Sequence, residues 1–284
     1  MNTTLNLGVI GTGRIGRLHA GHLAYRIARA RLAVVTDVDA ASAAACAEAC
    51  RVEAVADYRA VLDRADVDAV VICSPTDTHA AMIEAAAAAG KHVFCEKPIA
   101  LDLAEIDRTL DAVARAGIRF QVGFNRRFDP SFRRVRDAVE GGEVGEPHLL
   151  HLVSRDPAPP PLSYVRRSGG LFLDMAIHDF DMARFLVGVE FVTVQALGAA
   201  LVDPAIGTAG DVDTAAVQMQ TASGKIAVIT NSRRATYGYD QRIEVHGSRG
   251  MLRAGNVHMS TLERADGAGF TGDVIQNFFI DRYV

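Results

Sequence analysis

The segment Gly11-Thr12-Gly13-Arg14-Ile15-Gly16 constrains the fold of this chain more than any other feature. It follows the apolar run of residues 7–10 and opens a stretch of helical composition. Glycines at this spacing allow a tight turn and let a pyrophosphate approach the backbone at the N-terminus of the helix, where its charge is stabilised. The pattern therefore predicts a βαβ unit that binds a dinucleotide.

Asp37 indicates which dinucleotide is bound. It lies 21 residues beyond Gly16, close to the end of the next apolar run. A carboxylate there can accept hydrogen bonds from ribose hydroxyls and would repel a 2′-phosphate, and the following residue, Val38, is not an arginine that could bind one. We therefore expect NAD rather than NADP, bound by Gly11, Thr12, Gly13, Arg14, Ile15, Gly16 and Asp37. The alternatives are a glycine turn without a cofactor and the glycine loop of a methyltransferase.

Short apolar runs alternate with helical stretches over the first 123 residues. The runs lie at residues 7–10, 32–35, 69–73, 92–95 and 120–122, and they show little polar alternation. Strands that are buried on both faces of a parallel sheet have this composition. The alternation predicts an α/β fold, in which residues 1–123 form an NAD-binding Rossmann domain with a doubly wound parallel sheet.

The pattern changes after Phe124. Longer strand-like runs dominate there, at residues 148–153, 191–202, 214–221, 225–232 and 242–245, with one amphipathic helix over residues 174–186. A short turn at residues 222–225 joins two of these runs, which is typical of antiparallel strands. Residues 124–284 are therefore predicted to form a second, α+β domain on a mainly antiparallel open sheet, which would bind the substrate.

The composition argues against several other classes of protein. The net charge of −4 gives no electrostatic reason to bind nucleic acid or an acidic membrane surface. No apolar run approaches the roughly 20 residues of a membrane-spanning helix, and the start of the chain does not resemble a signal peptide, so we expect a cytoplasmic location. Cys46, Cys50, Cys73 and Cys95 have no further Cys or His nearby at ligand spacing, so we expect packing thiols and no metal site.

Two polar segments follow apolar runs at the expected carboxyl edge of the parallel sheet, where ligands of such sheets bind. Glu96 and Lys97 follow residues 92–95, although a solvated lysine at a strand end would show the same pattern. Ser74 and Thr76 follow residues 69–73, and they are candidates for contacts with the nicotinamide ribose or for capping of the next helix. His79 is a further candidate for the cofactor site, although a histidine at this position is more often a surface residue.

Asp174 and His178 are four residues apart in the predicted helix, which would place both on one face about one turn apart. A histidine beside a carboxylate is suited to act as a general base, because imidazole titrates near neutral pH. The alternative is an ion pair on the helix surface. Asp179 and Asp181 do not share this face, and we expect them to be solvated or to cap the helix.

Together these features resemble the Gfo/Idh/MocA oxidoreductases, and within them the branch that oxidises inositol. The likeness covers essentially the full chain and is most specific in residues 122–129, 154–161, 168–186 and 231–240. It implies NAD-dependent oxidation of a secondary hydroxyl of a cyclic polyol, with myo-inositol as the first candidate, by a homotetramer. The alternatives are another cyclitol or sugar (scyllo-inositol, glucose or an anhydrosugar) and a catalytically inactive NAD-binding protein. Members of the family usually continue well past residues 279–284, so the second domain is expected to be short at its C-terminus.

The resemblance also implies roles for individual residues. It implies a catalytic set of Lys97, Asp174 and His178. In that set His178 takes the proton from the reacting hydroxyl, Lys97 donates a hydrogen bond to the same oxygen, and Asp174 orients His178 or holds a neighbouring hydroxyl. The implied substrate contacts are Asn125, Arg126, Asp156, Asp174, His178, Tyr237 and Tyr239. For the two tyrosines, packing around Gly238 is the alternative.

Overall fold

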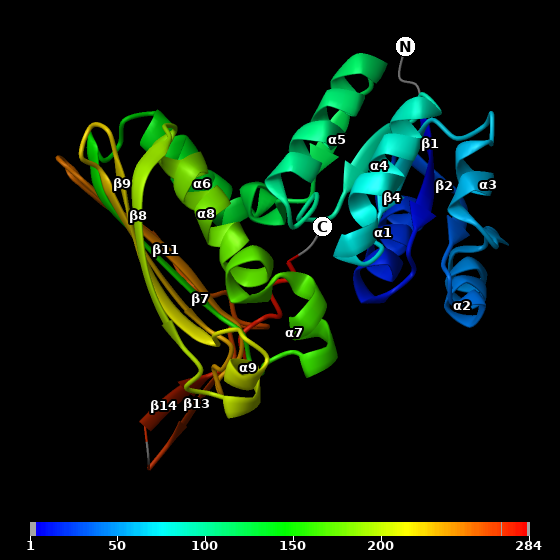
Figure 1. The fold of residues 1–284 in the computed structure, drawn as a ribbon. Helices are drawn as coiled ribbons and strands as arrows, with labels where there is room; N and C mark the ends of the chain where they lie inside the picture. Colours follow the sequence, from blue (N-terminus) through cyan, green and yellow to red (C-terminus); the bar gives the residue numbers. More distant parts are fainter. Residues whose placement is uncertain (1–3, 268, 283–284) are drawn as a thin grey trace. The chain divides into compact units, whose positions relative to one another are not determined.

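The chain divides into two units, Met1–Gly123 and Phe124–Val284, in the computed structural model. The structure describes residues 4–267 and 269–282. Figure 1 colours the first unit from blue towards green and the second from green to red. Each unit has its own six-stranded sheet and its own apolar core.

The sheet of the first unit is parallel and has the strand order β3-β2-β1-β4-β5-β6. Its strands are β1 (Leu5–Ile10), β2 (Ala30–Thr36), β3 (Glu53–Val55), β4 (Ala69–Ile72), β5 (His92–Cys95) and β6 (Phe120–Val122). The predicted doubly wound sheet is confirmed. Strand β3 was not predicted, because it has three residues and lies at an edge of the sheet without a buried side chain.

Helices cover both faces of this sheet, and Figure 1 shows them along its strands. They are α1 (Arg14–Tyr25), α2 (Ala40–Cys50), α3 (Tyr58–Leu62), α4 (His79–Ala88) and α5 (Leu103–Ala116), with a 3₁₀ turn η1 (Thr76–Thr78) before α4. Leu23 of α1 packs with Val35 in one apolar layer, and Ile83 of α4 packs with Ile72 in the other. Strand side chains alternate between two buried layers, so these strands read as continuous apolar runs. The four cysteines are free thiols, and they pack in or against these layers as expected.

The second unit has a mixed sheet in the order β12-β11-β7-β10-β9-β8. Its strands are β7 (Pro147–Arg155), β8 (Phe191–Ala199), β9 (Thr214–Thr221), β10 (Ile226–Ser232), β11 (Asp240–Gly247) and β12 (Gly250–Ala254). β7 and β10 are parallel, and the other neighbouring pairs are antiparallel. The mainly antiparallel sheet predicted from the sequence is therefore confirmed.

Strand β8 ends at Ala199, three residues before the predicted end, because the chain turns there. The buried carboxylate of Asp213 accepts the backbone N–H groups of Leu201, Val202 and Asp203 at 2.8–2.9 Å. These bonds direct the chain into the short helix α9 (Pro204–Thr208) instead of continuing the strand.

The helices of the second unit are η2 (Asn125–Phe128), α6 (Pro130–Glu140), α7 (Leu162–Ser168), η3 (Phe172–Ala176), α8 (Ile177–Val187) and α9. Figure 1 shows α6 and α8 along the sheet. The core of the second unit lies between these helices and the sheet: Phe132 of α6 and Met182 of α8 pack with Leu152 and Ile229 of the sheet. The predicted helix over residues 174–186 is present, but its first turn, η3, is π-helical. Among the described helices none is long and apolar enough to cross a membrane.

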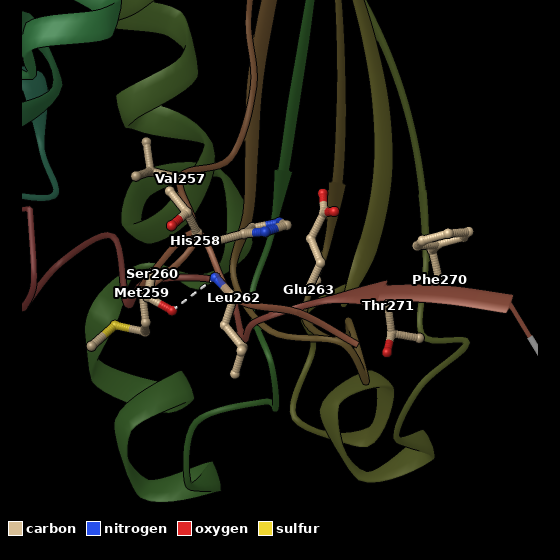
Figure 2. A pocket seen from close by; sticks show the side chains of 10 residues that line it. Val257, His258, Met259, Ser260, Leu262, Glu263, Phe270 and Thr271 are labelled. Atoms are coloured by element: carbon tan, nitrogen blue, oxygen red, sulfur yellow. Dashed lines mark hydrogen bonds between the residues drawn. The ribbon is translucent and has the colours of Figure 1, made fainter. Parts of the chain in front are cut away.

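The last described segment forms a hairpin and then returns to the core. The hairpin consists of β13 (Glu263–Asp266) and β14 (Gly269–Gly272). Beside it is an open hollow of about 730 Å³ lined by residues 257–263 and 270–272 (Figure 2). Beyond the hairpin, Phe278 is buried against Phe132, and the guanidinium of Arg282 pairs with the carboxylate of Asp129 at 2.6 Å.

Candidate functional site

The three glycines of the first loop meet different requirements. A Cβ on Gly11, which has a φ of +93°, would lie 2.6 Å from the Cys73 carbonyl carbon, and one on Gly16 would collide with the Gly11 carbonyl oxygen. Packing therefore demands glycine at both positions. A Cβ on Gly13 would have no described atom within 4 Å. Glycine at this position leaves open space above the loop, which is what a pyrophosphate needs in order to approach the backbone.

The N-terminus of α1 is suited to hold that pyrophosphate. Gly13 is the residue before the helix, and among the described residues no side chain caps it and no acidic residue lies in its first turn. The backbone N–H groups and the positive end of the helix dipole therefore remain available to an anion. Arg14 and Ile15, the first two helical residues, follow directly, and the Arg14 side chain is exposed.

Asp37 lies just beyond β2 and faces the glycine loop. Its Oδ2 accepts hydrogen bonds from the backbone N–H of Thr12 at 2.5 Å and from the Thr12 hydroxyl at 3.1 Å. Burial raises the pKa of Asp37, but hydrogen bonds from the Asp39 and Thr12 amides outweigh it and lower the pKa below its usual value. The carboxylate is thus ionised at neutral pH and would repel a 2′-phosphate. Its second role, fixing the loop through Thr12, was not predicted from the sequence.

His79 connects the loops that follow β4 and β5. Its ring is buried, with Nδ1 2.7 Å from the Pro98 carbonyl oxygen and Nε2 2.8 Å from the Ser74 carbonyl oxygen. The alternative of a surface residue is therefore wrong, because two backbone carbonyls hold the ring inside. The role of His79 in cofactor binding stays a prediction. The Ser74 hydroxyl accepts a hydrogen bond from the Thr78 hydroxyl at 2.7 Å, and Thr76 begins η1 and is half-buried.

Glu96 and Lys97 follow β5 at the same edge of the sheet. The Glu96 carboxylate lies 2.8 Å from Nε2 of His19, which is on α1, and both side chains are largely buried. Lys97 follows Glu96 in the chain and is half-buried. The next residue, Pro98, carries the carbonyl oxygen that lies 2.7 Å from Nδ1 of His79. The structure therefore brings the predicted residues of the first unit to one edge, at the carboxyl ends of β1, β2, β4 and β5.

In the second unit, the inner face of the sheet changes from apolar to polar at one end. Leu152, Ile229 and Ile243 lie in the core, and the next inward positions on the same three strands are Ser154, Asn231 and Gln241. Ser154 pairs in register with both Asn231 and Gln241, and all three side chains are buried. Asn231 and Gln241 were not predicted as site residues, because only the sheet register shows that they adjoin Ser154.

Arg126 and Asp179 form a buried ion pair above this polar row. Arg126 Nη1 lies 2.5 Å from Asp179 Oδ1, and Arg126 Nη2 donates to the Ser154 hydroxyl at 2.9 Å. Asn231 donates to the other oxygen of Asp179 at 2.8 Å. Burial raises the pKa of Asp179, and the Arg126 guanidinium opposes this. The expected solvation of Asp179 is therefore wrong.

Asp181 is also buried instead of solvated. It pairs with Arg127, with Nη2 2.5 Å from Oδ1 and Nε 2.8 Å from Oδ2. The two aspartates of α8 thus bind successive arginines of η2, which fixes η2 against the helix that carries His178. The sequence showed the charges but not their partners, which are more than 50 residues away.

His178 lies among aromatic rings. Its ring centroid is 6.4 Å from that of Phe124 and 5.7 Å from that of Phe279, which in turn lies 5.6 Å from Tyr239. The imidazole is almost fully buried. Tyr239 thus belongs to the aromatic group around His178. The hydroxyl of Tyr237, by contrast, donates to Asp240 at 2.8 Å and accepts from Arg155 at 3.0 Å.

Asp174 is held from two sides. Its Oδ1 accepts a hydrogen bond from the Tyr164 hydroxyl at 2.8 Å, and its Oδ2 lies 3.5 Å from Nη1 of Arg233. Neither partner was predicted from the sequence. Arg233 follows Asn231 at the inward spacing of two residues, and this is the signal that could have identified it.

Asp156 follows β7 and is fixed by its backbone to the segment beyond β10. Its N–H donates to the Ser232 carbonyl at 3.0 Å, and its own carbonyl accepts from the Ala235 N–H at 2.7 Å. Burial raises the pKa of its carboxyl group to about 6, and the positive charges of Arg233 and Arg126 limit this rise. Asp156 is therefore a carboxylate that titrates close to neutral pH.

Several buried polar atoms in this region have no hydrogen-bond partner among the described residues. They are the acceptors Asn125 Oδ1 and Asn231 Oδ1 and the donor Gln241 Nε2. Unpaired buried polar atoms cost about 1–3 kcal/mol each, so native structures keep them where a ligand or water supplies the partner. Hydroxyl groups both donate and accept, so a polyol has partners for both kinds of atom.

Comparison with family models decides the class of the protein. Residues 5–124 match the model described as an oxidoreductase family with an NAD-binding Rossmann fold, and residues 132–253 match the Gfo/Idh/MocA C-terminal domain. The chain belongs to the Gfo/Idh/MocA oxidoreductase family. Its first unit is the NAD-binding Rossmann domain of that family, and the glycine loop and Asp37 fit the cofactor.

Individual relatives are similar along almost the whole chain. An inositol 2-dehydrogenase of Rhizobium meliloti is 52% identical over 99% of this chain and 84% of its own length. A myo-inositol 2-dehydrogenase of Thermotoga maritima is 50% identical over 98% and 84%. Among solved structures, a similar one is the crystal structure of scyllo-inositol dehydrogenase from Lactobacillus casei with bound NAD(H) and scyllo-inositol. Its sequence is 37% identical to this chain, and the two structures match with a TM-score of 0.90 over 97% of this chain and 84% of that one.

Proposed function

We propose that this protein oxidises a secondary hydroxyl of a cyclic polyol with NAD⁺, and that its substrate is myo-inositol, which becomes 2-keto-myo-inositol. The observation that carries the proposal is the identity of 50–52%, over nearly the whole chain, to two enzymes named for the 2-dehydrogenation of inositol. The unpartnered donor and acceptors at the polar end of the second sheet support it, because they match a ligand with several hydroxyl groups.

The reaction removes a hydride and a proton from one carbinol group, and bound NAD⁺ supplies the hydride acceptor. We assign the proton to His178, a largely buried imidazole that can accept it from the hydroxyl. We assign Lys97 a hydrogen bond to the same oxygen, where its positive charge favours the developing alkoxide. The contacts of Asp174 with Tyr164 and Arg233 support a role in holding a neighbouring substrate hydroxyl.

The proposed substrate contacts differ in their surroundings. Asn125 offers a buried acceptor, Asp156 a carboxylate and Tyr239 a ring beside Phe279. The Arg126 side chain already binds Asp179 and Ser154, so we propose that it supports the site rather than reaching the substrate. Asn231 and Gln241 join the proposed contacts because of their unpartnered atoms.

Substrate oxidation is tested by mixing the protein with NAD⁺ and a polyol and recording NADH absorbance. We expect turnover with myo-inositol, and the likeness to scyllo-inositol dehydrogenase makes scyllo-inositol the second polyol to compare. His178→Ala should remove turnover, while Arg133→Ala, which alters an exposed arginine on α6, should leave it unchanged. NADH binding without turnover of either inositol or of glucose would refute the proposal and indicate a catalytically inactive NAD-binding protein.

We further propose that the protein is a homotetramer of the cytoplasm. Strand β8 is exposed along nearly its whole length, and Leu149, Ile226 and Met251 expose apolar surface on the outer face of the same sheet. Such a face is suited to pack against another copy. The four free thiols fit a reducing compartment. Light scattering on the eluted protein should give four times the chain mass of 30.3 kDa, and a monomer mass would contradict the proposal.

A further inference from the structure

Arg233 is a buried arginine that the proposed reaction does not use. It directly follows β10, its side chain is 1% exposed, and its backbone N–H donates to the Asp213 carbonyl at 2.8 Å. Its Nε and Nη2 have no hydrogen-bond partner among the described residues. An isolated buried charge is strongly unfavourable, so the guanidinium must be compensated by charges around it.

Three carboxylates supply that compensation from three different segments. Asp174 Oδ2 lies 3.5 Å from Arg233 Nη1, and Asp211 Oδ2 lies 4.0 Å from Nη2. Asp156 is bonded through its backbone to Ser232 and Ala235, the residues on either side of the Arg233–Arg234 pair. Asp211 is already engaged by the backbone N–H of Leu171 at 3.0 Å. Of the three carboxylates, Asp156 and Asp174 are the ones proposed above as substrate contacts.

We propose that Arg233 is a positioning residue, a buried countercharge that keeps Asp156 ionised and holds the Asp174 carboxylate in place for the substrate. The inference rests on the proposed function, because that function gives the two carboxylates a polyol to bind. Arg233 acts through these carboxylates, since Asp174 Oδ2 lies 3.5 Å from its Nη1.

The charge balance around Arg233 supports this role. The titratable and charged groups around Asp156 and Arg233 are Arg126 from η2, Tyr164 from α7, Asp174 from η3, Asp179 from α8 and Asp211 before β9. Arg126 is committed to Asp179 at 2.5 Å. Arg233 therefore compensates the charges of Asp156, Asp174 and Asp211 together. It also opposes the rise in the pKa of Asp156 more strongly than Arg126 does.

The test compares three variants of the full chain. Arg233→Gln removes the charge, Arg233→Lys keeps it, and Arg234→Gln changes the exposed arginine next to it as the matched control. With NAD⁺ and myo-inositol, kcat/KM is measured as the pH falls through the range where Asp156 titrates. We expect Arg233→Gln to raise the midpoint of the acid limb by about one pH unit or more. This change lowers kcat/KM about tenfold on the acid side. Arg233→Lys and Arg234→Gln should keep the parent midpoint.

A second measurement needs no substrate. The melting-temperature difference between Asp156→Asn and its parent, recorded against pH, reports the ionisation of Asp156 in the folded protein. In the Arg233→Gln background this difference should keep growing to a higher pH and level off at a larger value, because the folded-state pKa of Asp156 rises while the unfolded-state pKa is unchanged. If the parent oxidises no cyclic polyol, the proposed function fails while this measurement still tests Arg233. If Arg233→Gln does not fold, the double variant with Asp211→Asn, which removes one positive and one negative charge, serves in its place.

Three results would overturn the inference. The first is a folded Arg233→Gln protein with the parent pH profile in both measurements, since the charge would then not act on Asp156. The second is a midpoint that moves as far in Arg233→Lys as in Arg233→Gln, since packing and not charge would then be responsible. An equal shift in Arg234→Gln would likewise remove the special role of Arg233.

Discussion

Replacing Asp156 with asparagine is expected to stabilise the protein at neutral pH, although it alters a proposed substrate contact. The asparagine side chain has nearly the shape of a protonated carboxyl group and carries no charge. Burial raises the pKa of Asp156 from 3.8 to about 6, with Asp174 and Asp179 adding to the rise and Arg233 and Arg126 opposing it. The ionised form is therefore destabilised in the folded state relative to the unfolded chain, even after the arginines are counted.

The size of the effect follows from the two pKa values. One pKa unit corresponds to about 1.4 kcal/mol, so the difference amounts to about 3 kcal/mol. Because the pKa is raised on folding, the stability that Asp156 contributes is fully present below pH 3.8 and is lost as the pH rises through about 6. The gain from Asp156→Asn should therefore be small in acid and reach its full size near neutral pH, where the melting temperature should rise by several degrees.

The assay is the melting temperature of the apoprotein, recorded for parent and variant in steps from acid to mildly alkaline pH. Asp240→Asn is the control with the opposite sign. Although burial raises the pKa of Asp240, hydrogen bonds from Arg242, Asn256 and Tyr237 lower it below its usual value. Losing that carboxylate should lower the melting temperature at neutral pH. A variant Asp156→Asn that is no more stable than its parent near neutral pH, or whose gain does not change with pH, would refute the reasoning.

Three further predictions concern the cofactor and the chemical step. Gly13→Ala should keep the parent melting temperature but weaken NADH binding, which is measured by titration of the cofactor fluorescence. Gly16→Ala should lower the melting temperature, because its Cβ collides with the Gly11 carbonyl. Equal behaviour of the two variants would contradict this account of the loop. Asp37→Ala should reduce the preference for NAD⁺ over NADP⁺, and it should weaken the binding of both cofactors because Asp37 also binds Thr12. An unchanged ratio of the kcat/KM values for NAD⁺ and NADP⁺ would rule out a role of Asp37 in cofactor selection. His178→Ala should lower kcat by about 10²–10⁴, and a kcat within a factor of two of the parent would leave His178 a merely structural residue.

Much of the first unit could be predicted from the sequence because its signals are local. The glycine spacing, the position of Asp37 and the apolar runs each depend on residues close together in the chain. The parallel sheet is buried on both faces, so its strands are visible as uninterrupted apolar segments. Strand β3 was not predicted because it has only three residues, none of which is fully buried.

The site in the second unit depends on contacts between distant residues, and this limited prediction from the sequence. Asp179 looked like a solvated residue of α8 until Arg126, 53 positions earlier, was found against it. Gln241 adjoins Ser154 only because β11 pairs with β7 in that register. The burial of His79 could not be predicted, because its two carbonyl partners, Ser74 and Pro98, follow different strands. Periodicity within one segment cannot show such partners.

The transfer of a label from substrate to cofactor tests the central claim most directly. The protein is incubated with NAD⁺ and myo-inositol that carries deuterium at C2, and the reduced cofactor and the product are analysed by mass spectrometry. Direct hydride transfer from the carbinol carbon predicts NADH that carries the deuterium, formed in equal amount with an unlabelled inosose. Reduced cofactor without deuterium would place the oxidation at another ring carbon, and the absence of any reduced cofactor would contradict the dehydrogenase activity itself.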